Sequence, residues 1–276
     1  MIIVKPLGGL CNRLRVLNSA FHLAIINNEN VFVVWEKNAA LNADFHQLFL
    51  PEKKFQFLDK SYRLNYFLIY RYKHIILSFD YLKKIILTFV TFNFIYIDDN
   101  KIKDKARFSL LHLTKKNIIL NTCYPLFEHN AETNHYIIFK PVLHIQYRID
   151  AIISKFNLSL LNGIHIRRTD NIKSIEGSNI DSFKELIFHS IELNKNVFFY
   201  LSTDDSKVDE DFLSHFKGHI KHLENKDFQR DTLKGIEDAV VDLFILSKTS
   251  KIYGSFWSSF TDVSSYINNV PLIIVR

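Results

Sequence analysis

The sequence contains few of the residues that build disulfide-rich or metal-clustered proteins. Cys11 and Cys123 are the only cysteines among 276 residues, so the chain has enough for one disulfide but not for a disulfide framework or a four-cysteine metal site. A reducing compartment is therefore the default expectation. The apolar run at 1–6 is too short for a signal peptide and predicts a first β-strand instead.

Long apolar runs and familiar catalytic signatures are also missing. No stretch of about 18 residues is free of charge, which argues against a membrane-spanning helix. The 7 glycines form neither a P-loop nor a Gly-x-Gly-x-x-Gly fingerprint, and no Gly-x-Ser-x-Gly elbow occurs. No His-x-His, Glu-x-x-His or Asp-x-Asp group falls at the end of a predicted strand, so we expect no metal centre.

The overall composition is that of a folded, basic protein. Hydrophobic residues make up 47% of the chain and charged residues 23%, which fits one large domain or two of ordinary size. Lys and Arg number 35 against 29 Asp and Glu, which gives a formal charge of +6. Such an excess suits an anionic ligand, an anionic membrane surface or nucleic acid, and equally an ordinary solvated surface.

The first half opens with the pattern of a Rossmann-like unit. A buried strand at 2–4, a glycine turn at 6–9, a helix at 11–26 and a strand at 31–35 follow one another. A further short strand is predicted at 118–120.

The stretch 62–97 is crowded with aromatic and aliphatic residues that charged residues interrupt. Two interpretations stay open. The stretch forms amphipathic helices in the core of the first domain, or it presents a basic amphipathic face to an anionic membrane surface.

The second half alternates between strands and helices, which predicts a parallel sheet with helices on both faces. A helix at 141–156 leads into it. The predicted strands are 161–166, 197–201, a short one within 219–223, 251–253 and 272–275, and the predicted helices include 182–194, 239–247 and 259–267. We therefore expect an α/β protein with two Rossmann-like halves, divided as 1–145 and 146–276.

The first strand of the second half runs directly into two arginines. Alternation along the strand puts Ile164 and Ile166 on the core side, and His165 and Arg167 together on the other side. Arg168 follows, and we expect Asp170 to hold it. An arginine at this position suits a phosphate, because its planar fork binds two oxygens at once.

Two more strand ends carry polar groups. Asp204 and Asp205 follow one strand, and their side chains should point to opposite faces. The serine-rich turn 254–259 precedes a helix, where backbone N–H groups and hydroxyls favour an anion. Since ligands bind beyond the carboxyl ends of parallel strands, the three ends together would hold a diphosphate. Taken singly, each group also fits a structural role as a core histidine, an internal ion pair or a helix cap.

The segment His165-Ile166-Arg167-Arg168-Thr169-Asp170 resembles the His-x-Arg-Arg-x-Asp motif of the GDP-fucose-dependent α-1,2/α-1,6 fucosyltransferase superfamily, in the branch of the nodulation and core enzymes. Two further segments are similar to its later motifs, and one near the N-terminus resembles the Gly-Gly-Leu-Gly-Asn opening of related enzymes. These are 200–205, then 242–247 with 254–259, and 6–14. Residues 40–140 contain no motif that we can assign to a family. Cys11 replaces the third glycine of that opening, and segments of the longer enzymes are missing after Asn171.

The resemblance implies a two-Rossmann (GT-B) glycosyltransferase that inverts the sugar anomeric carbon without a metal or cofactor. The donor GDP-fucose would bind mainly the C-terminal half, and the N-terminal half would lie on the acceptor side. The implied catalytic residues are Arg167, which would bind the β-phosphate, with Arg168 and Asp170. The implied donor-binding residues are His165 and Asp242 near guanine, Ser258 and Ser259 at the phosphates, and Arg167, Asp204, Gly8, Gly9 and Asn12.

The expected partners are a nucleotide sugar and a glycan or lipid-linked saccharide, with no nucleic acid. We expect a cytoplasmic protein, either free or peripheral on the inner face of a membrane. Three alternatives stay open: a non-catalytic basic protein that binds nucleotides or nucleic acid, as the interleaved Lys and Tyr of 60–106 suggest; a glycosyltransferase for another nucleotide sugar; and a membrane-surface protein with a Rossmann scaffold.

Overall fold

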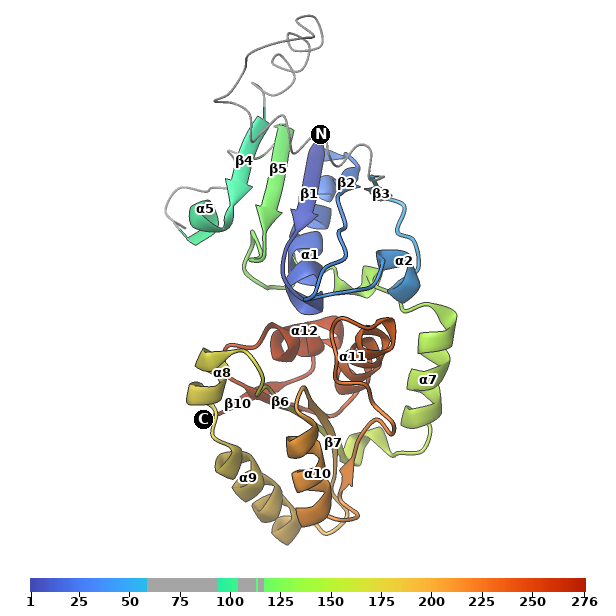
Figure 1. Cartoon of the computed structure of the whole chain (residues 1–276), viewed down its shortest axis with the longest axis vertical. Coiled ribbons are helices and arrows are strands. Elements are labelled where there is room, and N and C mark those ends of the chain that lie inside the picture. The colour runs from blue at the N-terminus through green and yellow to red at the C-terminus, as the bar shows by residue number, and fades with distance from the viewer. Residues whose placement is uncertain (59–93, 104–112, 114–116) are drawn as a thin grey trace, which may run out of the picture. The chain divides into compact units, whose positions relative to one another are not determined.

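The computed structural model describes residues 1–58, 94–103, 113 and 117–276. The chain divides into two compact units (Figure 1). The first comprises 1–36 with 51–135, and the second comprises 37–50 with 136–276. The boundary expected after residue 145 falls inside helix α7 (Leu143–Ile153), which belongs to the second unit.

The first unit is built on a five-stranded parallel sheet in the order β3-β2-β1-β5-β4. Its strands are β1 (Ile2–Pro6), β2 (Val31–Val33), β3 (Phe55–Phe57), β4 (Phe94–Asp98) and β5 (Asn117–Thr122). Helix α1 (Leu10–Asn27) follows β1 after the glycine turn, and the short α5 (Asp99–Lys103) follows β4. The β-loop-α-β opening that the sequence predicts is therefore confirmed.

The aromatic stretch 62–97 is described only at its end. Residues 62–93 lie outside the described residues, so the choice between core helices and a membrane-facing surface is not tested there. Phe94–Asp98 form β4, so this end of the stretch is a strand and not a helix. Within the described ranges, no helix combines the length and the apolar character that crossing a membrane requires.

The second unit is a five-stranded parallel sheet in the order β10-β9-β6-β7-β8. Its strands are β6 (Leu161–Ile166), β7 (Phe198–Thr203), β8 (Ile220–Lys221), β9 (Ile252–Ser255) and β10 (Leu272–Val275). Besides α7, its helices are α2 (Phe45–Leu48), α8 (Ile172–Gly177), α9 (Ile180–Leu193), α10 (Ser206–His215), α11 (Leu233–Leu246) and α12 (Ser259–Asn268), and 3-10 turns cover Tyr136–Ile138 and Leu158–Leu160.

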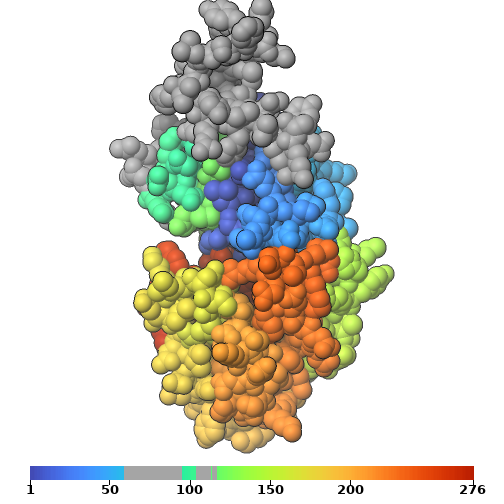
Figure 2. All heavy atoms as spheres, viewed as in Figure 1, coloured from blue at the N-terminus to red at the C-terminus, as the bar shows by residue number. Residues whose placement is uncertain are grey.

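Helices cover both faces of the second sheet. Ile164 and Ile166 pack in one core with Phe183 of α9 and Phe212 of α10, whereas α11 and α12 contact the opposite face. The surface that α9 and α10 present is visible in gold and orange in Figure 2. The two isoleucines thus lie on the core side, as strand alternation predicts.

The strand order creates a switch point between β6 and β9. From β6 the chain adds β7 and β8 on one side, and then crosses to add β9 and β10 on the other. In doubly wound sheets this reversal opens a crevice at the carboxyl ends of the two central strands, and ligands bind there.

We predict that Ile164→Ala destabilises the second unit by about 2–5 kcal/mol, because the lost side chain leaves a cavity in a fully buried layer. The matched control is Ile273→Ala on β10, which is 45% exposed and should cost clearly less. Urea unfolding of both variants measures the difference. Equal losses would contradict the core position of β6.

Candidate functional site

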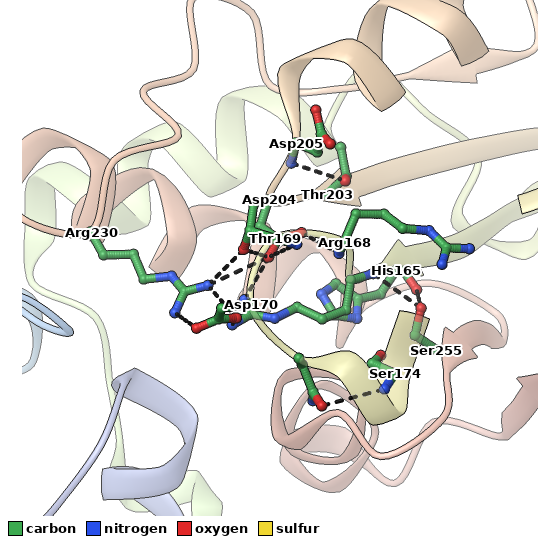
Figure 3. Close-up of polar contacts among 12 residues, drawn as sticks. His165, Arg168, Thr169, Asp170, Ser174, Thr203, Asp204, Asp205, Arg230 and Ser255 are labelled. Carbon is green, nitrogen blue, oxygen red and sulfur yellow. Dashed lines mark hydrogen bonds and ion pairs between the residues drawn. The ribbon is translucent and has the colours of Figure 1, made fainter. Parts of the chain in front are cut away.

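The polar residues at the switch point gather around the ends of β6, β7 and β9 (Figure 3). A serine joins two of these strand ends. The backbone N–H of Arg167 donates to Ser255 Oγ at 3.0 Å, and that hydroxyl lies 3.3 Å from the His165 carbonyl oxygen, to which it donates. The carboxyl ends of β6 and β9 are therefore fixed to each other by a buried side chain.

His165 anchors β6 to the first turn of α12. Its Nδ1 lies 2.7 Å from Thr261 Oγ1, and its ring stacks on Phe260 with centroids 4.7 Å apart. Burial lowers the pKa of His165 to about 3, with the charges of Arg167 and Lys226 adding to burial and Asp204 opposing it. The imidazole is therefore neutral around pH 7, and its neighbours on α12 give it a structural role in addition to the predicted place near guanine.

Arg167 lies between two carboxylates. Its Nη1 is 2.9 Å from Asp204 Oδ2, and its Nη2 bonds Asp170 Oδ1. The side chain keeps 19% of its surface exposed, so the guanidinium is oriented by the protein but still reachable from solvent.

Asp204 collects hydrogen bonds from the end of the neighbouring strand. It accepts from the backbone N–H of Arg168 at 2.7 Å, and from the N–H and hydroxyl of Thr169. Burial alone would raise the pKa of Asp204, but the charge of Arg167 and these hydrogen bonds outweigh burial and lower it. The carboxylate is therefore charged at neutral pH and links the ends of β6 and β7.

Arg168 points away from Arg167, and the expectation that Asp170 holds Arg168 is wrong. The Arg168 guanidinium donates to the carbonyl oxygens of Ile175 and Ser178, and thereby fixes the segment around α8. The strand ends at Ile166 and the chain bends at Thr169 and Asp170, so strand alternation no longer applies and Asp170 turns back to meet Arg167.

Asp204 and Asp205 diverge, as strand alternation predicts (Figure 3). Asp205 is the N-cap of α10, where its carboxylate accepts from the backbone N–H of Lys207 at 2.9 Å. Asp205 thus has the capping role, and Asp204 alone faces the arginines.

Asp242 is the centre of a buried network on α11. Its carboxylate accepts from Tyr200 Oη at 2.6 Å, Ser202 Oγ at 2.9 Å and Lys226 Nζ at 2.6 Å. Only 1% of the residue is exposed. Burial, together with the charge of Asp242, raises the pKa of Tyr200 well above its usual value, so Tyr200 remains a hydrogen-bond donor.

The serine turn forms the start of α12, which spans 10 residues. Ser258 is its N-cap and is 3% exposed, yet its side chain makes no capping hydrogen bond. Trp257 precedes it in a left-handed backbone conformation, with φ of 53°, and is 57% exposed. Asn171 fixes this turn by donating from Nδ2 to the Trp257 carbonyl at 2.8 Å. Ser258 and Ser259 therefore stand at the positive end of a helix dipole.

Gly8, Gly9 and Asn12 lie in the first unit, in the turn from β1 into α1 and on the first turn of that helix. Gly8 has φ of 80°, a conformation that favours glycine. The fully buried Arg13 stabilises the turn by donating to the Gly8 carbonyl at 2.8 Å and to the Glu36 carbonyl at 2.6 Å, and it stacks on buried Trp35. Burial lowers the pKa of Arg13 to about 10.

Arg230 is a site residue that the sequence analysis missed. It belongs to the loop between β8 and α11, and its Nη1 and Nη2 lie 2.9 and 3.2 Å from Asp170 Oδ2 and Oδ1. Nη2 also lies 3.1 Å from Thr169 Oγ1 and 3.4 Å from Asp204 Oδ2. An arginine in an irregular polar loop carries no periodic signal, so the spacing of residues did not reveal it.

The described ranges contain no group of three or more His, Cys, Asp or Glu residues that could hold a metal ion. Arg167 and Arg230 place positively charged side chains at the strand ends, where both pair with Asp170 and Asp204.

Comparison of sequences finds no match, either to a model of a known protein family or to a curated protein. Comparison of structures does. NodZ α-1,6-fucosyltransferase, known from Bradyrhizobium and soaked with GDP-fucose, aligns at a TM-score of 0.61 with 18% identity, over 99% of this chain and 94% of that one. A mutant of Arabidopsis thaliana FUT1 in complex with GDP aligns at a TM-score of 0.62 with 13% identity, over 99% of this chain and 69% of that one. POFUT1 in complex with GDP aligns at a TM-score of 0.57 with 10% identity, over 99% of this chain and 97% of that one.

The fold is that of GT-B-type fucosyltransferases. The chain is similar to these solved GDP-fucose enzymes over nearly its whole length, with two parallel five-stranded sheets. At identities of 10–18% the likeness establishes the architecture, which is the fold class that the sequence predicts.

Two histidines should make stability depend on pH in opposite directions. Because the pKa of His165 is depressed, the unfolded chain binds a proton that the folded chain refuses, so stability falls as the pH drops below about 6.5. The hydrogen bond that the His222 ring donates to the Asp209 carboxylate raises the pKa of His222, so the contribution of His222 to stability is complete below about pH 6.5 and is lost as the pH rises through the raised pKa.

Urea midpoints measured across the pH range check both signs. His165→Gln should flatten the loss of stability on the acid side, and His222→Gln should flatten the loss above about pH 6.5. A variant that leaves its own side of the profile unchanged would contradict the pKa shift assigned to that histidine.

Proposed function

We propose that this protein is an inverting, metal-independent glycosyltransferase that moves a sugar, fucose in our reading, from a GDP-sugar to a hydroxyl of a glycan or lipid-linked saccharide. The observation that carries the proposal is the position of Arg167. It follows β6 at the switch point of the sheet, and its backbone N–H bonds Ser255, the last residue of β9 before the turn into α12. The shared fold with enzymes solved with GDP or GDP-fucose supports the choice of nucleotide.

In the proposed reaction, the acceptor oxygen attacks the anomeric carbon of the donor sugar from the face opposite the phosphate. The bond between the anomeric carbon and the β-phosphate oxygen breaks, the acceptor hydroxyl releases its proton to the surrounding water, and GDP leaves with the bonding electrons. Negative charge grows on the departing diphosphate in the transition state. The fixed guanidinium of Arg167 stabilises that charge, as a bound cation does in other transferases.

The neighbours of Arg167 support this role because they orient it in advance. Asp204 holds Nη1 at 2.9 Å, and the Ser255 hydroxyl holds the Arg167 backbone N–H at 3.0 Å. A preorganised donor needs no rearrangement at the moment of reaction, and such donors stabilise charge best. The helix start at Ser258 and Ser259 would add backbone N–H groups to the phosphates.

We propose that Asp242 contributes to recognition of guanine through the side chains that donate hydrogen bonds to it. Its carboxylate already accepts hydrogen bonds from Tyr200, Ser202 and Lys226. In this arrangement Asp242 would hold these side chains in place beneath the guanine base. Guanine would either rest on this network or take the place of Lys226 on the carboxylate. His165 would stiffen the adjacent wall through α12.

The rival function is a basic binding protein without catalysis. Nucleic-acid affinity falls steeply as salt concentration rises, whereas binding of a nucleoside diphosphate in a preformed site falls less. Binding of GDP without binding of oligonucleotides would exclude the rival. Flotation with anionic liposomes tests separately whether the protein associates with a membrane surface, as proposed for a lipid-linked acceptor.

We predict that GDP and GDP-fucose raise the melting temperature by about 5 °C at 100-fold excess over the dissociation constant, because they bind only the native state. UDP-, CMP- and ADP-sugars are the controls in the same thermal-shift series. Stabilisation by a UDP-sugar alone would overturn the assignment of the nucleotide.

We predict that Arg167→Lys lowers the rate of sugar transfer about 100-fold or more, because a lysine cannot bind the diphosphate with two parallel hydrogen bonds. Arg148→Lys is the matched control, because Arg148 pairs with Asp238 on α11 and a lysine can keep that ion pair. Near-normal turnover of Arg167→Lys, with an unchanged melting temperature, would sink the role of Arg167.

A further inference from the structure

Asp170 lies between two arginines in the way an anionic ligand would. Its Oδ1 accepts from Arg167 Nη2 and, at 3.2 Å, from Arg230 Nη2, while its Oδ2 lies 2.9 Å from Arg230 Nη1. Figure 3 shows the Arg230 side chain extending toward Asp170. Arginines bind phosphates with the same geometry, in which guanidinium groups donate hydrogen bonds to two oxygens of one anionic group.

The two aspartates of the site differ in how firmly they are held. Asp204 is 13% exposed and accepts from the backbone N–H groups of Arg168 and Thr169, which follow β6. Asp170 has a side chain that is 59% exposed. Exposed ion pairs contribute little to stability, so the Asp170 carboxylate can leave at small cost whereas Asp204 cannot.

The charges of the site also favour the departure of Asp170. Arg167 and Arg230 are balanced by Asp170 and Asp204, so the cluster is neutral as it stands. A diphosphate that entered beside all four groups would face no net attraction. Without Asp170 in the cluster, the two guanidinium groups exceed the one remaining carboxylate by one charge.

The loop that carries Arg230 is fixed in place although the Arg230 side chain is 31% exposed. The backbone N–H of Asn42 donates to the Arg230 carbonyl at 3.2 Å, and Asn42 Nδ2 donates to the Asp231 carbonyl at 2.6 Å. A Cβ on Gly235 would lie 1.8 Å from the Gln229 carbonyl oxygen, so the loop packs directly on the first turn of α11 because that residue is glycine. The Arg230 side chain thus extends from a loop that hydrogen bonds and close packing hold in place.

We propose that Asp170 occupies a phosphate position between Arg167 and Arg230 in the nucleotide-free protein, and that the diphosphate of the donor displaces it and binds Arg230 as its second arginine. The assignment of the ligand as a nucleoside diphosphate rests on the proposed function. We call the pair of Arg167 and Arg230, with Asp170 displaced from between them, the clamp. The proposal of the clamp rests on the contacts of Asp170 and requires only a ligand with two linked phosphates.

Calorimetric titration of Asp170→Asn with GDP, inorganic pyrophosphate and guanosine tests the displacement. The amide keeps the size of the side chain but removes the competing charge, so GDP and pyrophosphate should bind about three- to fivefold more tightly. Guanosine has no phosphate and is the matched control. Unchanged or weaker binding of both anions would overturn the proposal, since Asp170 would then be a support for the arginines.

Arg230→Gln tests the second arginine in the same titrations. GDP and pyrophosphate should bind about tenfold more weakly, and GMP, which lacks the β-phosphate, should lose less. Equal losses for GDP and GMP, or no loss, would exclude Arg230 from the β-phosphate. Melting temperatures of the ligand-free variants show whether each remains folded, and Arg230→Lys supplies a second variant with the charge retained if the glutamine variant unfolds.

The outcomes separate the clamp from the proposed function. If pyrophosphate binds and tightens in Asp170→Asn while GDP binds no better than pyrophosphate, the clamp stands and the nucleotide assignment fails. If GDP binds the wild type and Asp170→Asn alike, the clamp fails and the nucleotide assignment stands. Absence of binding of either anion to the wild type overturns both.

Discussion

The site depends on one half-buried carboxylate that links three neighbouring groups. Asp204 ends β7, accepts the backbone N–H groups that follow β6, and pairs with the guanidinium of Arg167. A carboxylate in this position would be costly to bury without those donors, and Arg167 would be costly to orient without the carboxylate. The Asp204 carboxylate and the Arg167 guanidinium therefore stabilise each other in these positions. The seam between the two strands at their carboxyl ends is thus electrostatic, whereas the layer beneath it, at Ile164 and Ile166, is apolar.

The fold of the second half could be predicted from the sequence because its strands are buried on both faces and are separated by helices that each have one apolar side. The predicted strand 161–166 coincides with β6. Helix α11 was harder: it begins at Leu233, six positions before the predicted start at 239, because the Thr232 side chain caps it by accepting from the Gly235 N–H. The first turn of that helix contains Gly235, and glycine is a poor helix former. Phe94–Asp98 shows the opposite difficulty, since a short apolar run fits a strand as well as a helix.

The grouping of polar residues could be predicted where they follow a strand and could not be predicted where they come from a loop. Arg167, Asp170 and Asp204 were expected at one edge of the sheet, and Arg167 does contact both carboxylates. Arg230 comes from a segment 60 positions beyond Asp170, and no local pattern announces it. The partner of Arg168 was misjudged for a related reason. Sequence proximity suggested Asp170, but the backbone direction sends Arg168 to the carbonyls of the α8 segment.

The two tryptophans of the chain lie one in each unit, in contrasting surroundings. Trp35 is 2% exposed and stacks under Arg13, whereas Trp257 is 57% exposed at the turn before α12. The chain thus contains two intrinsic fluorophores that differ in emission colour and in access to a dissolved quencher. Acrylamide should quench the red-shifted emission of Trp257 first and leave the blue emission of Trp35. Events at the switch point and events in the first sheet can therefore be followed separately in the unlabelled protein.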